Sequence, residues 1–345
     1  MNDDRNRQLF LIINYIYIKF IKSQLIIEMK LLLLLLLLQI YNYSSIACNV
    51  LSLSGGGSFG ALELGILSSQ QTPDMSYQLM TGVSVGGLNV GYLSYFNNVN
   101  DGINSLKDIY INMKNDDIYE FNFIERNRLS FYDTAPLRKT IKKILSPLTT
   151  QVISAIVGSS NLYTGYMDIF NLGDYNLEDK IKVLMTTSAI PIVFPPIEFN
   201  NSLYVDGGMI SNSIINGIET VIKCNNYNIT YISTSSPLPI YTDSTNNITN
   251  IYEYTKRVID VIKYDFNNEL AEIKNFYCTP INNKDETKAI GDRGDTGGIG
   301  GIISINYCYP TYKYLYKYSI LDFTKGEELF NIGLKYNKCI LIKLC

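Results

Sequence analysis

Residues 49–60 read NVLSLSGGGSFG, and residues 77–93 read YQLMTGVSVGGLNVGYL. In each stretch a short apolar run with the character of a β-strand leads into a glycine-rich turn, and a helical pattern follows. Strands and helices that alternate in this way are typical of a parallel sheet covered by helices. The two stretches together predict an α/β fold.

The rest of the chain continues this alternation. We expect strands around residues 164–165, at 203–205, at 229–235 and at 302–308, and helices near 103–113, before 187, and at 134–145, 251–274 and 325–336. A chain of 345 residues is long enough for one large α/β domain or two small ones.

The first 47 residues differ from the rest because they contain two strongly apolar runs without a polar face. Residues 9–21 read LFLIINYIYIKFI, and eight leucines occupy 31–38. Two interpretations stay open: a secretory signal that starts at Met29, or a membrane anchor in a chain that starts at Met1. We predict a signal peptide or anchor at 1–47, a folded domain at 48–345, and a membrane-associated or secreted location.

The composition excludes several kinds of chemistry. The chain contains no histidine, which rules out Ser-His-Asp triads and histidine-based zinc sites. The net charge is −3 at pH 7, so no basic excess is available to bind nucleic acid. Six cysteines are present without a C-x-x-C pair, and their even number behind a signal-like segment permits either disulfides or buried thiols.

A candidate nucleophile lies in the second glycine-rich turn. Gly82-Val83-Ser84-Val85-Gly86 is a G-x-S-x-G sequence between a strand and a helix, where the glycines permit a sharp turn that presents the serine hydroxyl. Ser84 is therefore the candidate nucleophile, with Gly82 and Gly86 as motif glycines. A plain turn is the alternative interpretation of so short a motif.

The first turn, Ser54-Gly55-Gly56-Gly57-Ser58-Phe59-Gly60, fits two kinds of anion site. It matches G-x-G-x-x-G, but the second strand does not end in the acidic residue that a dinucleotide loop needs about 20 positions later. Successive backbone N–H groups at a helix N-terminus can instead form an oxyanion hole. We expect Gly55, Gly56 and Gly57 to provide it, with Gly60 as a motif glycine.

A serine nucleophile in a chain without histidine needs a carboxylate as its base or, less often, a lysine. Asp206 follows the short strand at 203–205, and Gly207 and Gly208 leave room for its carboxylate to face another loop. An Asp-Gly hairpin turn is the alternative interpretation. The combination with Ser84 and the glycine-rich loop favours Asp206 as the base.

These three motifs resemble the signatures of patatin-like phospholipases, a family of lipid acyl hydrolases that use a Ser-Asp dyad. Residues 132–137 and the proline-rich stretch 188–196 add to the resemblance, which extends from about residue 49 to 336. It implies a three-layer fold in which a mainly parallel central sheet is flanked by helices. It also implies Ser84 as the nucleophile, Asp206 as the base, and the backbone of Gly55–Gly57 as the oxyanion hole.

Two positions depart from the family pattern. Phe59 stands where the family usually has arginine or lysine in the oxyanion loop, and Ile192 replaces the usual glycine after Pro191. Loss of the cation affects the expected catalytic efficiency more than the expected fold.

The leading hypothesis is a carboxylic ester hydrolase of phospholipase A type, which forms an acyl-enzyme and uses no metal or organic cofactor. Its expected partners are a membrane lipid or lipid ester substrate and a membrane surface, and not nucleic acid. The alternative is a catalytically weak, membrane-anchored lipid-binding protein that keeps the fold, as the Phe59 departure suggests. The motifs do not specify the lipid head group, the acyl chain or the position of the ester.

Overall fold

The computed structural model describes residues 19, 24, 29–33, 47–72, 75–121, 129–235, 303–313 and 315–344. The chain separates into two units, Met1–Ile46 and Ala47–Cys345. Most of the predicted signal or anchor lies outside the described residues, as does the helix predicted near 251–274. Among the described residues, no helix combines the length and the apolar character needed to cross a membrane.

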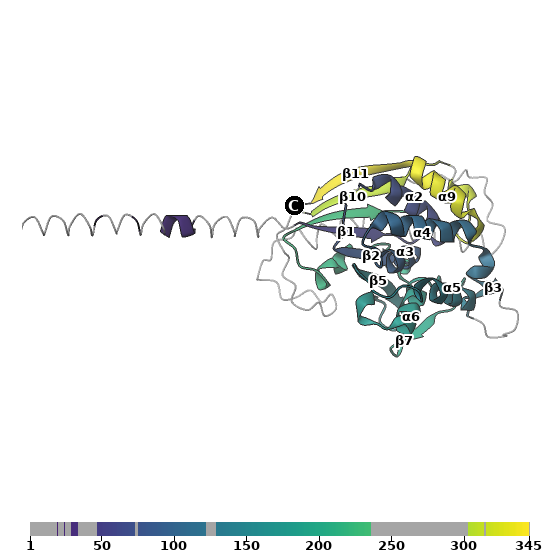
Figure 1. The fold of residues 1–345 in the computed structure, drawn as a ribbon. Helices are drawn as coiled ribbons and strands as arrows, with labels where there is room; N and C mark the ends of the chain where they lie inside the picture. The colour runs from purple at the N-terminus through teal and green to yellow at the C-terminus, as the bar shows by residue number, and fades with distance from the viewer. Residues whose placement is uncertain are drawn as a thin grey trace, which may run out of the picture. The chain divides into compact units, whose positions relative to one another are not determined.

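The second unit is built on a mixed sheet, in which nine strands are described (Figure 1). Their order is β11-β10-β9-β1-β2-β5-β8-β7, and β6 also pairs with β5. The inner strands are mutually parallel: β10 (Ile303–Pro310), β9 (Asn226–Ile232), β1 (Ala47–Leu53), β2 (Leu79–Val83) and β5 (Ser154–Asn161). Antiparallel pairing adds the outer strands β11 (Asn337–Leu344), β6 (Met167–Asn171), β8 (Ser202–Asp206) and β7 (Ile197–Phe199).

Helices pack against one face of this sheet, as Figure 1 shows. They are α2 (Gly60–Gln70), α3 (Val85–Leu93), α4 (Val99–Asn112), α5 (Ala135–Leu145), α6 (Leu177–Thr187) and α9 (Gly326–Lys335). The predicted mainly parallel central sheet flanked by helices is therefore confirmed.

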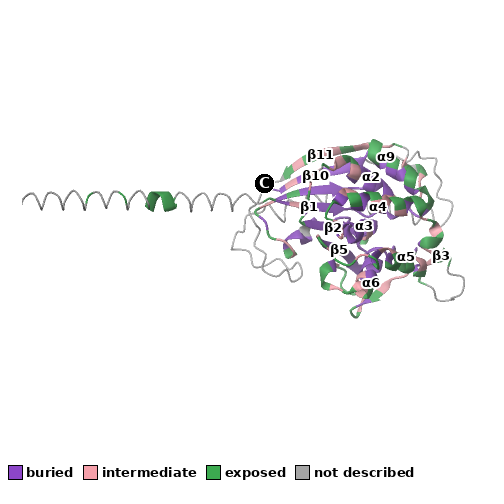
Figure 2. Ribbon diagram, viewed as in Figure 1, coloured by how far each residue is buried: buried purple, intermediate pink, exposed green. Residues whose placement is uncertain are grey.

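Alternate residues of the inner strands supply two hydrophobic clusters. On β1, Leu51 and Leu53 face the helices, whereas Val50 faces the opposite side of the sheet. The 3-10 segment η5 (Ile215–Thr220) contributes two isoleucines to the cluster on that opposite side, and Ile214 directly before it adds a third. Both faces of the inner strands are thus covered, which Figure 2 shows as a buried central layer. This burial explains why apolar side chains occur on both faces of the inner strands.

Local sequence signals account for several helix starts. The side chain of Asn98 caps α4, and that of Asn176 caps α6, each by accepting a backbone N–H. Pro136 occupies the first turn of α5, where a missing N–H costs no hydrogen bond. The remaining described elements are short: β3 (Glu120–Phe121), β4 (Tyr132–Asp133), and the 3-10 segments η1 (Gly57–Phe59), η2 (Asn115–Asp117), η3 (Leu172–Asp174), η4 (Gly207–Met209), η6 (Leu315–Lys317) and η7 (Phe323–Lys325).

Strand β11 follows the helix predicted at 325–336, where no further strand is predicted from the sequence. This strand begins directly after α9, with Tyr336 alone between them, and pairs with β10 over its whole length. Its side chains alternate as an edge strand requires: Ile340 and Ile342 pack against the core, and Leu341 is exposed. The absence of a turn signal after the helix concealed the strand.

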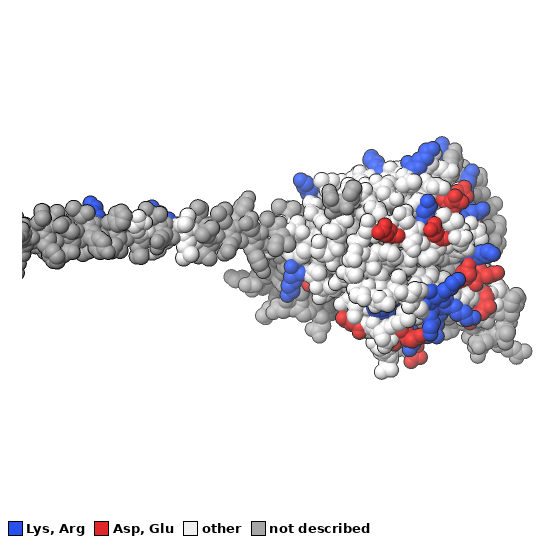
Figure 3. Space-filling view, viewed as in Figure 1, with Lys and Arg blue, Asp and Glu red and all other residues white. Residues whose placement is uncertain are grey.

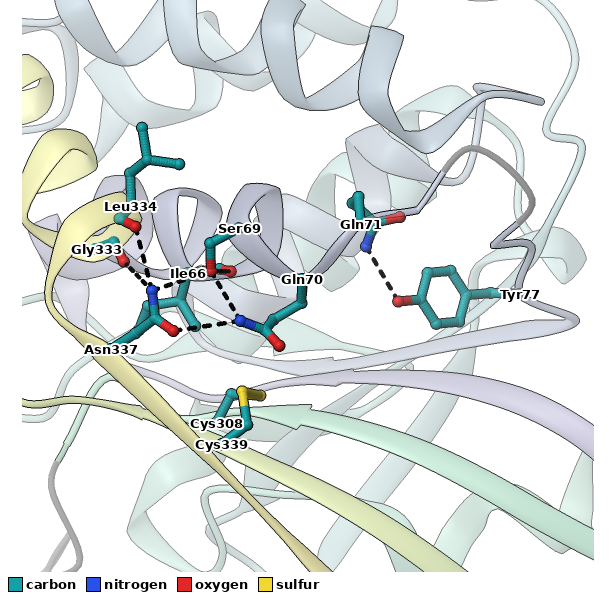
Figure 4. Close-up of a disulfide and its surroundings, with 10 residues drawn as sticks. All are labelled: Ile66, Ser69, Gln70, Gln71, Tyr77, Cys308, Gly333, Leu334, Asn337 and Cys339. Atoms are coloured by element: carbon teal, nitrogen blue, oxygen red, sulfur yellow. Dashed lines mark hydrogen bonds between the residues drawn. A yellow bond between two sulfur atoms is a disulfide. The ribbon is translucent and has the colours of Figure 1, made fainter.

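Four of the six cysteines form two disulfides, Cys48–Cys224 and Cys308–Cys339. Cys278 and Cys345 lie outside the described residues. The second bond joins directly opposed residues of β10 and β11 on the side of the sheet that faces α2 (Figure 4). Beside it, the amide of Asn337 donates hydrogen bonds to residues of both α2 and α9. These four cysteines are therefore disulfide-bonded and are not buried free thiols.

Charged side chains gather around α5 and α6 on the face that Figure 3 shows. Glu178 on α6 accepts hydrogen bonds from Arg138 at 2.9 Å and from Lys142 at 2.5 Å, both on α5. The bond from Lys142 lowers the pKa of the Glu178 carboxyl. All three groups are exposed to solvent, which screens their attraction, so they contribute little to stability.

Candidate active site

The turn at Ser84 has a strained backbone. Ser84 lies between β2 and α3 with φ 55° and ψ −128°, a conformation that residues with a side chain rarely adopt. An ideal Cβ on Gly82 would lie 2.3 Å from the carbonyl oxygen of Gly86, and one on Gly86 would lie 2.4 Å from that of Leu53. Both positions therefore require glycine, because neighbouring backbone occupies the space of a side chain.

The hydroxyl of Ser84 donates a hydrogen bond to Asp206. The distance from Oγ of Ser84 to Oδ2 of Asp206 is 2.5 Å, and the two residues are 3% and 5% exposed. The strand register explains the contact, because β5 lies between β2 and β8. Val83 pairs with Gly158 on β5, and Asp206 pairs with Ser159, the next residue. Residues 122 positions apart are thus brought together as the sequence predicts.

Further hydrogen bonds fix both members of this pair. The amide of Ser84 donates to Oγ1 of Thr187 at 2.9 Å. The amide of Asp206 donates to the carbonyl of Ala189 at 2.9 Å, and Oδ1 of Asp206 accepts the amide of Gly208 at 2.8 Å. The second carboxylate oxygen, Oδ2, is left directed at the serine. The proline-rich stretch 188–196 therefore helps to anchor the aspartate.

The two glycines after Asp206 are required for different steric reasons. An ideal Cβ on Gly207 would lie 2.3 Å from the carbonyl oxygen of Gly158, so the backbone of β5 requires glycine there. An ideal Cβ on Gly208 would lie 3.0 Å from Oδ1 of Asp206, close to the bond that its own amide makes. The Asp-Gly-Gly sequence thus forms a capped 3-10 turn after an antiparallel strand, rather than a β-hairpin turn.

The glycine-rich loop runs beside Ser84. An ideal Cβ on Gly55 would lie 2.9 Å from Cβ of Ser84, so only glycine permits this approach. The amide of Gly55 donates to Oδ1 of Asn212 at 2.9 Å. Within the described part of the chain, the amides of Gly56 and Gly57 donate to no acceptor. The amide of Gly55 is thus already paired, whereas those of Gly56 and Gly57 have no described acceptor.

Contacts distant in sequence hold this loop. Oγ1 of Thr234 donates to the carbonyl of Gly55, and the amide of Ser58 donates to the carbonyl of Ile320 at 2.8 Å. Phe59, at the position where the family usually has a cation, is partly buried against the main hydrophobic cluster. The residue that replaces the cation therefore contributes packing to the loop.

Sequence reasoning missed Thr187, Asn212 and Thr234. None belongs to a motif that can be recognised by spacing: Thr187 is the last residue of α6, and Asn212 and Thr234 lie in two separate loops. Only their contacts with Ser84 and Gly55 reveal them. In the residues that the structure describes, no group of three or more acidic or cysteine side chains could hold a metal ion.

The arrangement is equipped for acyl transfer: a buried hydroxyl meets a carboxylate beside backbone amides without acceptors. A family model described as patatin-like phospholipase matches residues 51–218, which include the glycine-rich loop, Ser84 and Asp206. Residues 51–218 are therefore similar to the patatin-like phospholipases, a family of lipid acyl hydrolases.

Comparison with other proteins adds little beyond the family. No curated protein matches the sequence. Among solved structures, the crystal structure of VipD from Legionella pneumophila matches with 11% identity and a TM-score of 0.33, over 85% of this chain and 68% of that chain. This score is too low to support an inference, so the assignment rests on the family model.

Proposed function

We propose that the protein is a lipid acyl hydrolase of phospholipase A type, with Ser84 as nucleophile and Asp206 as general base. The observation that carries this proposal is the 2.5 Å hydrogen bond from the serine hydroxyl to the carboxylate. The chain has no histidine, so the carboxylate is the group placed to accept the serine proton. A lipid ester is the substrate class that the family supports.

The reaction proceeds in two halves. Oγ of Ser84 attacks the ester carbonyl carbon while Oδ2 of Asp206 takes the hydroxyl proton, and a tetrahedral oxyanion forms. The oxyanion collapses, the carbon–oxygen bond to the lipid alcohol breaks, and Asp206 returns the proton to the departing alcohol. Water then attacks the carbonyl carbon of the acyl-serine while Asp206 takes a proton from it. The bond from that carbon to Oγ of Ser84 breaks, Asp206 returns the proton to Oγ, and the fatty acid leaves.

The amides of Gly56 and Gly57 are the proposed donors to the oxyanion, since no described acceptor occupies them. Ser84 directly precedes α3, and the positive end of that helix also favours negative charge near the hydroxyl. Loss of one oxyanion donor typically lowers kcat by about 10² to 10³-fold. These backbone groups supply stabilisation that does not depend on the cation absent at position 59.

The decisive experiment combines active-site labelling with product analysis. Purified protein is treated with a fluorophosphonate probe and, separately, with diacyl phospholipid vesicles, and Ser84→Ala serves as the matched control. The expected result is labelling of Ser84 and release of fatty acid together with lysophospholipid. A folded protein that shows neither would contradict the enzyme and favour the lipid-binding alternative.

We also propose that the protein is membrane-associated or secreted. Two disulfides support this location, because such bonds persist mainly in oxidising compartments. Expression in a eukaryotic host, followed by carbonate extraction, thiol titration and amino-terminal sequencing, tests the proposal. A reduced, full-length protein in the cytosol would contradict it.

A further inference from the structure

A buried polar cluster lies beside the glycine-rich loop. It consists of Glu63 on α2, Asn89 on α3 and Tyr110 on α4, which are 0%, 1% and 6% exposed. Nδ2 of Asn89 donates to Oε2 of Glu63 at 2.9 Å and to the carbonyl of Gly60 at 3.3 Å. The hydroxyl of Tyr110 donates to Oδ1 of Asn89 at 2.8 Å. The proposed hydrolysis uses none of these side chains directly.

The side-chain amide of Asn89 fits the cluster in one orientation. The carbonyl of Gly60 can only accept a hydrogen bond, so the NH₂ group must face it. The second hydrogen of the same NH₂ group then reaches Glu63, and the amide oxygen remains for the Tyr110 hydroxyl. Both amide hydrogens and the amide oxygen of Asn89 are therefore used to join α2, α3 and α4.

The cluster fixes the end of the loop against the nucleophile helix. An ideal Cβ on Gly60 would lie 2.3 Å from the hydroxyl oxygen of Tyr110 and 2.4 Å from Cγ2 of Val85. Gly60 ends the glycine-rich loop, and Val85 directly follows Ser84. The Tyr110 hydroxyl and the Val85 side chain thus hold Gly60 between them, which sets its position relative to the serine.

Glu63 is linked to the end of the loop. Burial raises the pKa of the Glu63 carboxyl well above its ordinary value, although the hydrogen bond from Asn89 acts in the opposite direction. Oε2 of Glu63 and the carbonyl of Gly60 share the NH₂ group of Asn89, whereas Oε1 of Glu63 has no hydrogen-bond partner among the described residues. In the described residues no cation pairs with Glu63. An apolar residue would avoid the cost of burying this carboxyl, so packing alone does not account for it.

We propose that Glu63, Asn89 and Tyr110 are positioning residues, which hold the oxyanion loop at the distance from Ser84 that the transition state requires. The proposal rests on the hydrolase function proposed above. An oxyanion exists only after attack on the ester, so a displaced loop weakens transition-state binding more than substrate binding. Disturbing the cluster should therefore lower kcat and leave KM nearly unchanged.

The test compares variants with a control from the same helix pair. Tyr110→Phe removes the hydroxyl at Asn89, whereas Tyr92→Phe removes a hydroxyl that contacts Ser105 at 2.6 Å, also between α3 and α4. Tyr110→Phe and Glu63→Leu are expected to lower kcat by about tenfold to a hundredfold, with KM within about twofold. Tyr92→Phe is expected to retain the kcat of the wild type.

A conservative variant and the serine control make each outcome decisive. Glu63→Gln can still accept the Asn89 bond and should keep kcat within about threefold of the wild type, even if Glu63→Leu does not fold. Equal kcat for Tyr110→Phe and Tyr92→Phe, in an enzyme that Ser84→Ala inactivates, would overturn the positioning role alone. Hydrolysis by the wild type no faster than by Ser84→Ala would instead remove the proposed function and this inference together.

Discussion

The two carboxylate oxygens of Asp206 have different partners. The role of Asp206 as base can therefore be tested by Asp206→Asn, which replaces one oxygen by an NH₂ group. Oδ1 accepts the Gly208 amide, and Oδ2 accepts the Ser84 hydroxyl. Asn in place of Asp206 can keep the first contact but presents an NH₂ group that cannot take a proton. Asp206→Asn is expected to fold normally and to lose activity by about 10² to 10⁴-fold.

Steady-state hydrolysis, measured beside thermal unfolding curves, checks this expectation. Near-normal turnover by Asp206→Asn would show that another group accepts the serine proton.

Gly55 tests how closely the loop must approach the nucleophile. A methyl group there would lie 2.7 Å from Oδ1 of Asn212 and 2.9 Å from Cβ of Ser84, so the loop must move. Gly55→Ala is expected to slow the reaction of Ser84 with a fluorophosphonate by about tenfold or more, because small displacements of the oxyanion donors are costly. The measurement is the rate of fluorophosphonate labelling.

Gly173→Ala is the matched control, since the nearest atom to a Cβ at Gly173 lies at 3.4 Å, an ordinary contact distance. Labelling at the same rate in both variants would show that the loop tolerates the shift.

At the scale of elements, strand-turn-helix units could be predicted because their signals are local. The glycines around Ser84 and those of the loop before α2 each predict a sharp turn within a few residues. The structure has both turns at the expected positions. The absence of histidine and the Asp-Gly-Gly sequence favour Asp206 as the partner of Ser84, and the family resemblance implies it, but the contact itself cannot be derived from either strand alone. It depends on β8 pairing with β5 in a particular register, which no local pattern specifies.

Glu63 shows more clearly what cannot be predicted from the sequence. A glutamate in a helix is normally expected on the solvent side, yet Glu63 is fully buried. Helix α2 packs against α3, α4 and α9 as well as the sheet, so a residue on almost any side of it is enclosed. The sequence pattern of α2 alone cannot predict this burial, because the burial depends on where three other helices pack.

The two disulfides allow a prediction about how elements are joined. Cys48–Cys224 closes 176 residues and Cys308–Cys339 closes 31. Chain-entropy arguments assign about 5 kcal/mol to the longer loop and about 4 kcal/mol to the shorter one. Replacing Cys48 and Cys224 together by alanine should therefore lower the free energy of unfolding more than replacing Cys308 and Cys339.

Urea unfolding of the oxidised proteins at one pH measures the two differences, with thiol titration as the control for mispairing. The reverse order would mean that strand pairing of β10 with β11 depends on its disulfide more than loop entropy suggests.

At the scale of the whole molecule, Glu63 makes stability depend on pH. Burial raises the pKa of the carboxyl in the folded state, so the folded protein holds a proton that the unfolded chain releases above about pH 4.3. Stability from this group is complete below that pH and is lost as the pH rises toward the folded-state pKa. Burial shifts the pKa of Glu219 in the same direction, although Lys223 opposes it.

Glu63→Gln removes one of these titrations and keeps the shape of the side chain. The stability of Glu63→Gln relative to the wild type should therefore increase from pH 5 to pH 7, by at most about 1.4 kcal/mol per pH unit. Urea unfolding at pH 5, 6 and 7 measures the difference. Glu178→Gln is the control: its carboxyl is exposed, and Lys142 lowers its pKa, so its loss should give no such increase. A pH-independent difference for Glu63→Gln would mean that the folded protein holds Glu63 ionised, and α2 would then bury a charge behind the oxyanion loop.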